Sequence, residues 1–222
     1  MTVADPTLRL ERALFREGAS VVIGCDEVGR GAIAGPVAVG ISVIELGVRR
    51  IPAGLRDSKM LSEAKRVELA PLAAEWSSFS AVGLATAEEV DRLGIIAALG
   101  IAGRRALEFA AAAGVAVDDA VLILDGKHDW LTQAVPRAPR VQLRVKADRD
   151  CASVAAASVI AKVHRDSLMI EADAAHPGYG WPGNKGYGSA DHYAALDALG
   201  PSPLHRRTWL HDRTAPTLFD IA

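Results

Sequence analysis

Short apolar runs alternate with longer segments of helical periodicity along this chain, a pattern typical of an α/β protein. Runs rich in β-branched residues predict buried strands, because such side chains favour a pleated, covered surface. The first expected strand begins at Val21. The others cover residues 36–46, 79–85, 121–125 and 140–145. The first two strands are joined by a glycine-rich turn, so we expect them to pair as a hairpin.

Helical spacing of apolar side chains fills the intervals between these strands. The expected helices cover residues 7–17, 63–75, 86–92, 94–113, 151–175 and 189–199. Their predicted N-caps include Ser62, Thr86, Asp150 and Ser189. Small side chains occupy almost all of residues 152–162, so this helix should lie very close to the sheet.

Residues 176–188 break the pattern and predict a long irregular loop. The segment holds five glycines, two prolines and three aromatic residues. Long loops in compact domains are usually functional, and aromatic rings beside Lys185 suit stacking on a sugar or base next to a phosphate. The alternative is a glycine-aromatic loop that packs on its own domain.

Composition favours an ordinary globular chain without a membrane anchor. Half of the 222 residues are hydrophobic and 23% are charged. The chain has no uncharged apolar stretch of about 18 residues, and charged residues interrupt the first twenty positions, so we expect no membrane partner and a cytoplasmic location. Cys25 and Cys151 are interpreted as small buried residues and not as a disulfide.

A net charge of −2 argues against a general polyanion binder, so a nucleic-acid partner would need a local basic patch. Two groups of basic residues are candidates for such a patch. One comprises Arg49, Arg50, Arg56 and Lys59, and the other comprises Lys185, His205, Arg206, Arg207, His211 and Arg213.

Acidic residues follow the expected buried strands. Asp26 and Glu27 close the first strand, and Asp125 closes the strand over 121–125. Ligands of open α/β sheets bind at the carboxyl ends of strands, and adjacent carboxylates favour a raised pKa or a bound cation. Asp148 is not needed as a cap and is a further functional candidate. The alternative for Asp26 and Glu27 is a solvated pair at a strand end.

The Gly29-Arg30-Gly31 turn directly follows the first acidic pair. Two glycines allow close backbone approach to a ligand, and the arginine supplies a permanently charged donor for phosphate. Asp57-Ser58-Lys59 lies in a later loop, where Asp57 or Ser58 could simply be loop caps. Carboxylates without histidine or cysteine ligands favour Mg²⁺ or Mn²⁺ over zinc.

Taken together, these motifs resemble bacterial ribonuclease HII. They are residues 24–31, Asp57-Ser58-Lys59, Asp125-Gly126, Lys146-Ala147-Asp148 followed by 153–162, residues 184–188, and Gly200-Pro201 with His205-Arg206-Arg207. The resemblance implies a ribonuclease H-like fold, with a mixed central sheet flanked by helices and a helical C-terminal extension. It divides the chain into a catalytic domain over 1–175 and a substrate-binding loop, helix and tail over 176–222.

The resemblance also implies an endoribonuclease that cleaves the RNA strand of RNA–DNA hybrids and cuts 5′ of ribonucleotides embedded in duplex DNA. The expected products are a 3′-hydroxyl and a 5′-phosphate, formed by hydrolysis with two Mg²⁺ or Mn²⁺ ions. The metal ligands and catalytic residues would be Asp26, Glu27, Asp125 and Asp148. The nucleic-acid contacts would be Gly29, Arg30, Gly31, Lys59, Ser158, Lys162, Lys185, Tyr187, Arg206 and Arg207.

Three other hypotheses remain open. The chain could bind nucleic acid without catalysis, which would require the loss of an acidic position, but all four are present. It could also be a metal-dependent exonuclease or phosphatase on a similar scaffold. Residues 215–220 end in Leu-Phe-Asp and loosely match peptides that dock on sliding clamps, so a clamp is a possible partner through the tail.

Overall fold

The computed structural model describes residues 5–48 and 50–210 and contains one mixed, five-stranded sheet. The strands are β1 (Val21–Val28), β2 (Val37–Glu45), β3 (Phe79–Ala85), β4 (Val121–Asp125) and β5 (Arg140–Arg144). They lie in the order β3-β2-β1-β4-β5. β1 pairs antiparallel with β2, as predicted, and parallel with β4.

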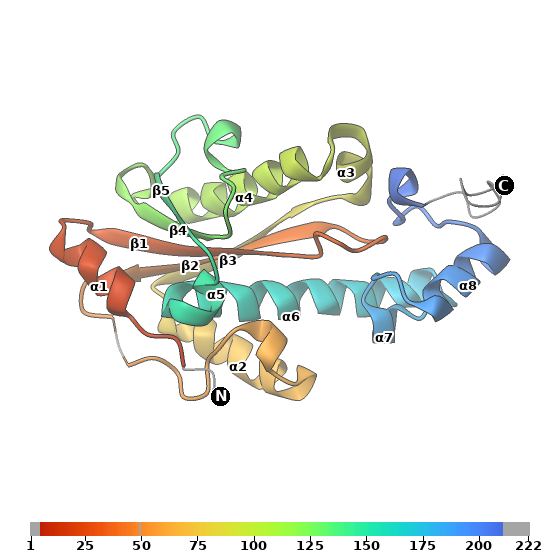
Figure 1. The fold of residues 1–222 in the computed structure, drawn as a ribbon, viewed down its shortest axis with the longest axis horizontal. Coiled ribbons are helices and arrows are strands. Elements are labelled where there is room, and N and C mark those ends of the chain that lie inside the picture. Colours follow the sequence, from red (N-terminus) through yellow and green to blue (C-terminus); the bar gives the residue numbers. More distant parts are fainter. Residues whose placement is uncertain (1–4, 49, 211–222) are drawn as a thin grey trace, which may run out of the picture.

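Helices cover both faces of this sheet (Figure 1). The α-helices are α1 (Arg9–Arg16), α2 (Glu63–Trp76), α3 (Ala87–Leu93), α4 (Ile95–Ala112), α5 (Ala147–Asp150), α6 (Ala152–Ala175), α7 (Trp181–Asn184) and α8 (Ala190–Leu199). α4 lies on one face and α6 on the other, with α2 packed along α6. Within the described residues, no helix combines the length and apolarity needed to cross a bilayer.

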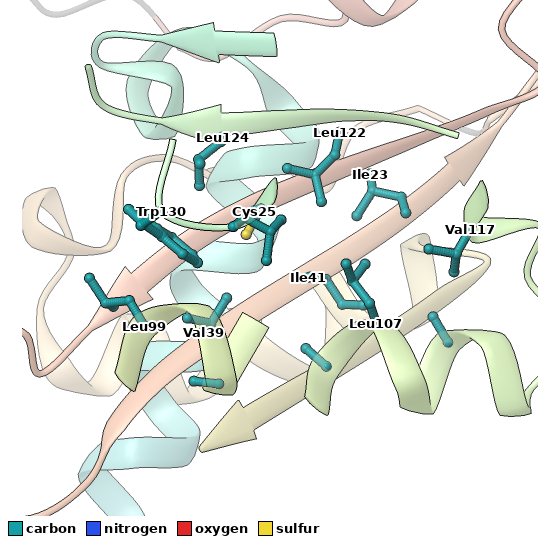
Figure 2. Close-up of a cluster of buried hydrophobic side chains, with 14 of the residues drawn as sticks. Ile23, Cys25, Val39, Ile41, Leu99, Leu107, Val117, Leu122, Leu124 and Trp130 are labelled. Atoms are coloured by element: carbon teal, nitrogen blue, oxygen red, sulfur yellow. The ribbon is translucent and has the colours of Figure 1, made fainter. Parts of the chain in front are cut away.

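Alternation along β1 divides the core into two layers. Ile23 and Cys25 point toward α4, where they meet Leu99, Leu107 and other buried side chains (Figure 2). Val22 belongs to the opposite layer, beneath α6. Because neighbouring strand residues face opposite sides, Asp26 is directed toward α6.

α6 lies on the sheet almost without intervening side chains. A Cβ atom added to Gly24 would lie 2.2 Å from the carbonyl carbon of Ser153, and one added to Gly40 would lie 2.5 Å from the carbonyl oxygen of Ala157. The small residues of α6 and these two strand glycines therefore permit the close approach that the sequence predicted. This contact brings α6 directly beneath the end of β1.

Three of the predicted N-caps are confirmed, and one is wrong. Ser62, Thr86 and Ser189 each accept a hydrogen bond from a backbone N–H of the helix that follows. Asp150 instead forms ion pairs with Arg144 and Arg149.

The start of α6 is capped from a distant part of the chain. Glu11 Oε1 accepts from both the N–H and the Oγ of Ser153, at 3.0 and 2.9 Å. A side chain 142 residues away thus performs the role that the sequence assigned to Asp150.

The C-terminal segment is more ordered than the loop predicted over 176–188. It contains α7, and Tyr179 and Trp181 are buried beside His192 and His205. These two rings pack on the protein itself, so they are not free to stack on a ligand. Tyr187 is the aromatic residue of this segment that stays exposed.

Candidate active site

The parallel register of β1 and β4 places two of the predicted acidic residues at one edge of the sheet. Cys25 pairs with Leu124, and the next residue in each strand is Asp26 or Asp125. β1 continues to Val28, so Asp26 and Glu27 lie on opposite faces of the strand and not side by side. Asp26 is buried, whereas Glu27 and Asp125 are partly exposed.

A tight bend after β5 brings Asp148 to the same edge. Lys146 adopts a left-handed conformation with φ of 62° and is followed by α5. The N–H of Ala147 donates to Asp125 Oδ1 at 2.6 Å, which places the next residue, Asp148, beside Asp125.

The Asp57-Ser58-Lys59 loop closes the acidic edge from the side of α2. Asp57 accepts from the N–H of Lys59, as the loop-cap alternative expects. Ser58 Oγ lies 2.8 Å from Ser158 Oγ, and Lys59 Nζ lies 3.3 Å from Asp148 Oδ2. The motif therefore contributes both a local cap and a cation facing the carboxylates.

Burial and mutual repulsion perturb the carboxylates. Burial raises the pKa of Asp26 to about 8, although a hydrogen bond from Ser158 opposes the shift. Burial also raises the pKa of Asp148, and the charge of Asp125 adds to this effect. The pKa of Lys59 is raised because the charges of Asp26 and Asp148 outweigh its own burial. Such a desolvated acidic cluster favours an added cation.

The Gly29-Arg30-Gly31 turn begins where β1 ends. Gly29 has φ of 82°, a conformation that favours glycine. Arg30 and Gly31 are exposed, and Arg30 Nη1 lies 3.4 Å from Glu27 Oε1. The turn therefore presents an accessible backbone and a guanidinium next to the acidic edge.

Tyr187 lies over two cations of α6. Lys162 Nζ is 5.6 Å and the guanidinium carbon of Arg165 is 5.4 Å from the centre of its ring. Lys162 also pairs with Asp166 at 2.7 Å.

Three side chains predicted to contact nucleic acid, those of Ser158, Lys185 and Arg206, are buried, and Gly29 is buried as well. Ser158 faces Ser58 beneath Asp26, and Lys185 pairs with Glu63. Arg206 is fully buried and donates to the carbonyl oxygens of Gly29, Arg30 and Gly35. These side chains support the site and do not reach its surface.

Among the described residues, the members of the second basic group therefore do not form a surface patch. His205 is also buried, and Arg207 is its exposed member within the described residues. Arg49, His211 and Arg213, together with the tail over 215–220, lie outside the residues that the structure describes.

Sequence reasoning overlooked Arg165 and the pair His192–His205. Arg165 lies four residues after Ala161 and four before Met169, and both of these are buried on the inner face of α6. The sequence did carry a signal for Arg165, because a charged side chain stands there at the four-residue spacing of the buried face of the helix. His192 Nδ1 donates to the carbonyl of Tyr187 at 2.9 Å, a contact that spacing alone does not reveal.

The acidic edge offers carboxylate oxygens as metal ligands, and a hard divalent cation prefers such ligands. Each carboxylate currently has another partner: the N–H of Glu27 for Asp26, Arg30 for Glu27, the N–H of Ala147 for Asp125, and Lys59 for Asp148. Across 5–48 and 50–210, no three acidic, histidine or cysteine side chains are grouped to hold one ion. Ion binding would therefore require some carboxylates to exchange partners.

Comparison with known proteins gives consistent matches. The family model described as Ribonuclease HII matches residues 23–212. A Ribonuclease HII of Streptomyces avermitilis is 45% identical over 95% of this chain and 86% of its own length. Another, from Cereibacter sphaeroides, is 43% identical over 94% of this chain and 93% of its own length.

Solved structures agree on the fold. The ribonuclease H2 of Pyrococcus horikoshii aligns with a TM-score of 0.64 at 25% identity, over 85% of this chain and 93% of its own. An RNase HII from Archaeoglobus fulgidus, solved in a complex with PCNA, aligns with a TM-score of 0.64 at 22% identity, over 90% of this chain and 99% of its own. Bst-RNase HIII in complex with Mn²⁺ also has a TM-score of 0.64, at 24% identity, over 85% of this chain and 65% of its own.

Proposed function

The chain belongs to the ribonuclease HII family, and from that premise we propose that it cleaves the RNA strand of RNA–DNA hybrids and cuts 5′ of single ribonucleotides in duplex DNA. It is a nuclease by family membership. The finer proposal covers the single-ribonucleotide substrate and the products, a 3′-hydroxyl and a 5′-phosphate.

The observation that carries the proposal is the continuity of β1 with the turn that follows it. Asp26 and Glu27 lie in the strand, and Gly29-Arg30-Gly31 begins two residues later. A ribonucleotide differs from a deoxyribonucleotide in its 2′-hydroxyl, which backbone groups can read without base specificity. We name residues 29–31 the ribose-sensing turn.

We propose Asp26, Glu27, Asp125 and Asp148 as ligands of divalent Mg²⁺ or Mn²⁺, two ions in all. When bound, such ions supply an activated water and neutralise charge on the leaving 3′-oxygen. The Mn²⁺ complex of Bst-RNase HIII supports the choice of a hard divalent cation. Lys59 balances Asp26 and Asp148 and lies where it can also meet a phosphate.

Substrate contacts are assigned to the exposed groups around this edge and to Lys162, which is partly buried and paired with Asp166. Arg30, Lys59 and Lys162 suit phosphate contacts, and the exposed ring of Tyr187 suits stacking on a sugar or base. Arg207 is exposed too, and its N–H donates to Asp91. The division into a catalytic part over 1–175 and a substrate-binding part over 176–222 belongs to the same proposal.

Cleavage mapping tests the proposed activity. Three duplexes are compared with Mg²⁺ and with EDTA: an RNA–DNA hybrid, a DNA duplex with one ribonucleotide, and an all-DNA duplex. We expect one cut 5′ of the single ribonucleotide, a 3′-hydroxyl product, and no cut in DNA. Stepwise shortening from an end would indicate the exonuclease alternative, and binding without a cut would indicate a binding module.

A sliding clamp is the proposed protein partner, through residues 215–220. The Archaeoglobus complex with PCNA supports this proposal by analogy. A pull-down with a bacterial clamp, using a chain that ends at Thr214 as the control, would detect it. Equal recovery of the full and shortened chains would refute docking through the tail.

A further inference from the structure

We propose that Arg165 is a positioning residue that fixes Tyr187 relative to the ribose-sensing turn. The inference rests on the proposed function, because it concerns how two parts of the same substrate site are held together. Arg165 lies in α6, outside both the turn and the segment that carries Tyr187.

The guanidinium of Arg165 donates hydrogen bonds to two loops, the one that follows the ribose-sensing turn and the one that carries Tyr187. Nε donates to the carbonyl of Pro36 at 2.8 Å, and Nη2 donates to that of Ala34 at 3.0 Å. Nη1 donates to the carbonyl of Lys185 at 2.9 Å, two residues before Tyr187. One planar group thus links the segment that leaves the turn to the segment that carries the ring.

Packing places this guanidinium directly between the turn and the ring. A Cβ atom added to Gly29 would lie 2.0 Å from Arg165 Nε, so the backbone of the turn lies against the guanidinium. The ring of Tyr187 covers the same group, with its centre 5.4 Å from the guanidinium carbon. A displacement of Arg165 would therefore change the separation of the two recognition elements.

Backbone contacts make the two loops a single unit. The N–H groups of Ile33 and Ala34 both donate to the carbonyl of Gly186, at 2.9 and 3.0 Å. A Cβ atom added to Gly186 would lie 2.5 Å from the carbonyl oxygen of Ala34, so the loops are in close contact there.

The energetic cost of Arg165 argues for a role beyond filling space. Its side chain is fully buried, and within the described residues no carboxylate forms an ion pair with it. Burial of a cation is unfavourable unless its donors are satisfied, and an apolar side chain would usually fill such a space at lower cost. The planar fork of an arginine can reach three carbonyls at once, whereas a lysine ammonium cannot reproduce that geometry.

A double-mutant cycle tests the proposal. Tyr187→Ala is measured alone and with Arg165→Lys, as kcat/KM on a DNA duplex with one ribonucleotide. We expect Tyr187→Ala to lower kcat/KM about tenfold in the wild-type background and less than about threefold beside Arg165→Lys, because a misplaced ring has less to lose.

The matched control applies the same substitution to an arginine remote from the site. Arg105 in α4 donates to Glu89 and to the carbonyl of Leu84, linking α4 to neighbouring elements. Beside Arg105→Lys, Tyr187→Ala should keep its full effect. Additive losses with Arg165→Lys, equal to those with Arg105→Lys, would reduce Arg165 to a structural residue and overturn the proposal.

A second readout does not depend on activity. The chain has three tyrosines, so a protein labelled with 3-fluorotyrosine should give three ¹⁹F resonances, with that of Tyr187 identified by Tyr187→Phe. Arg165→Lys should shift the Tyr187 resonance and leave those of Tyr179 and Tyr193 in place.

Arg165→Gln repeats the ¹⁹F measurement if the lysine variant does not fold. An unmoved Tyr187 resonance in a folded variant would refute positioning. If the wild-type chain failed to cut the duplex, the proposed function would fail, while an unmoved ¹⁹F resonance would still refute positioning by Arg165.

Discussion

Asp125 combines a structural contact with a proposed ligand role, and one substitution separates the two. Its Oδ1 accepts from the N–H of Ala147, a contact that an asparagine carbonyl oxygen can retain. Asp125→Asn should therefore preserve the fold while removing one negative charge from the metal site. We expect single-turnover cleavage to fall by at least about a hundredfold, since metal ligation supplies several kcal/mol to the transition state.

Calorimetry of the same variant supplies its control. The melting temperature should stay within a few degrees of the wild-type value, because the contact to Ala147 remains. Full cleavage activity in folded Asp125→Asn would remove Asp125 from the metal site.

His192 and His205 form a buried pair whose hydrogen bonds are all satisfied when both rings are neutral. His205 Nδ1 accepts from the N–H of Ser202, so its proton lies on Nε2, which donates to His192 Nε2 at 3.0 Å. His192 Nε2 must then accept, and Trp181 Nε1 donates to it as well. The remaining proton of His192, on Nδ1, is donated to the carbonyl of Tyr187. A proton added to His192 Nε2 or His205 Nδ1 would point at a group that already donates a hydrogen bond to that nitrogen.

Acid should therefore destabilise the protein through His205. Burial lowers its pKa to about 4, below the ordinary histidine value of 6.5, so the unfolded state binds the proton first. Stability is highest when both states are neutral, falls as pH drops below 6.5, and levels off near 4. The loss is up to about 3 kcal/mol.

Urea unfolding at a series of pH values measures this loss. His205→Gln should have a lower free energy of unfolding at pH 7 but a shallower decline between pH 6.5 and 4. An unchanged decline in that variant would assign the acid sensitivity to other groups.

At the scale of the elements, α6 connects most of the features described. It contacts β1 and β2 through small residues, presents Ser158 to Asp26, and carries Lys162 and Arg165 toward Tyr187. Its first turn is capped by Glu11 of α1. The correct placement of α6 is therefore a condition for the site.

Glu11 offers a test of that capping contact. Glu11→Ala leaves the N–H and Oγ of Ser153 without their acceptor, and we expect a loss of about 2 kcal/mol in the free energy of unfolding. Glu11→Gln keeps an acceptor oxygen and should cost less, because burial raises the pKa of Glu11 and its second oxygen has no hydrogen-bond partner.

Asp150→Ala is the matched control for Glu11→Ala. Asp150 was the predicted cap, but its ion pairs are partly exposed and should contribute little. Urea unfolding of the three variants compares them directly. A larger loss for Asp150→Ala than for Glu11→Ala would contradict the assigned cap.

The contrast between Asp150 and Glu11 shows which features could be predicted from sequence. Strands and the caps Ser62, Thr86 and Ser189 depend on neighbouring residues, so local patterns predict them. A cap supplied across 142 residues depends on tertiary packing and leaves no local signal.

The candidate site divides in the same way. The acidic residues could be selected because they follow apolar strands and match family motifs. The burial of Lys185 and Arg206 could not be predicted in this way. The carboxylate that pairs with Lys185 and the carbonyls that accept hydrogen bonds from Arg206 belong to distant segments of the chain. Basic residues next to a glycine-rich loop resemble a ligand surface until the fold shows which way they point.

At the scale of the whole molecule, the net charge is −2, yet the proposed substrate is a polyanion. Within the described residues, burial withdraws Lys185, His205 and Arg206 from the surface. The cations assigned to phosphate contacts are Arg30, Lys59 and Lys162. Binding should therefore rest on a few phosphate contacts together with contacts to the ribose.

This charge distribution predicts a weak dependence of binding on salt. Neutralising about three phosphates gives a slope of about −3 for the logarithm of the association constant against that of salt concentration. Fluorescence anisotropy with Asp125→Asn in EDTA, on a duplex with one ribonucleotide, measures the slope without cleavage. Lys59→Met should make it shallower by about one. Arg137→Met should not, because Arg137 pairs with Asp118 ahead of β4 and β5, at the sheet edge opposite the carboxyl ends of these strands. A slope steeper than about −6 would require a broad basic surface and would contradict binding through a few phosphates.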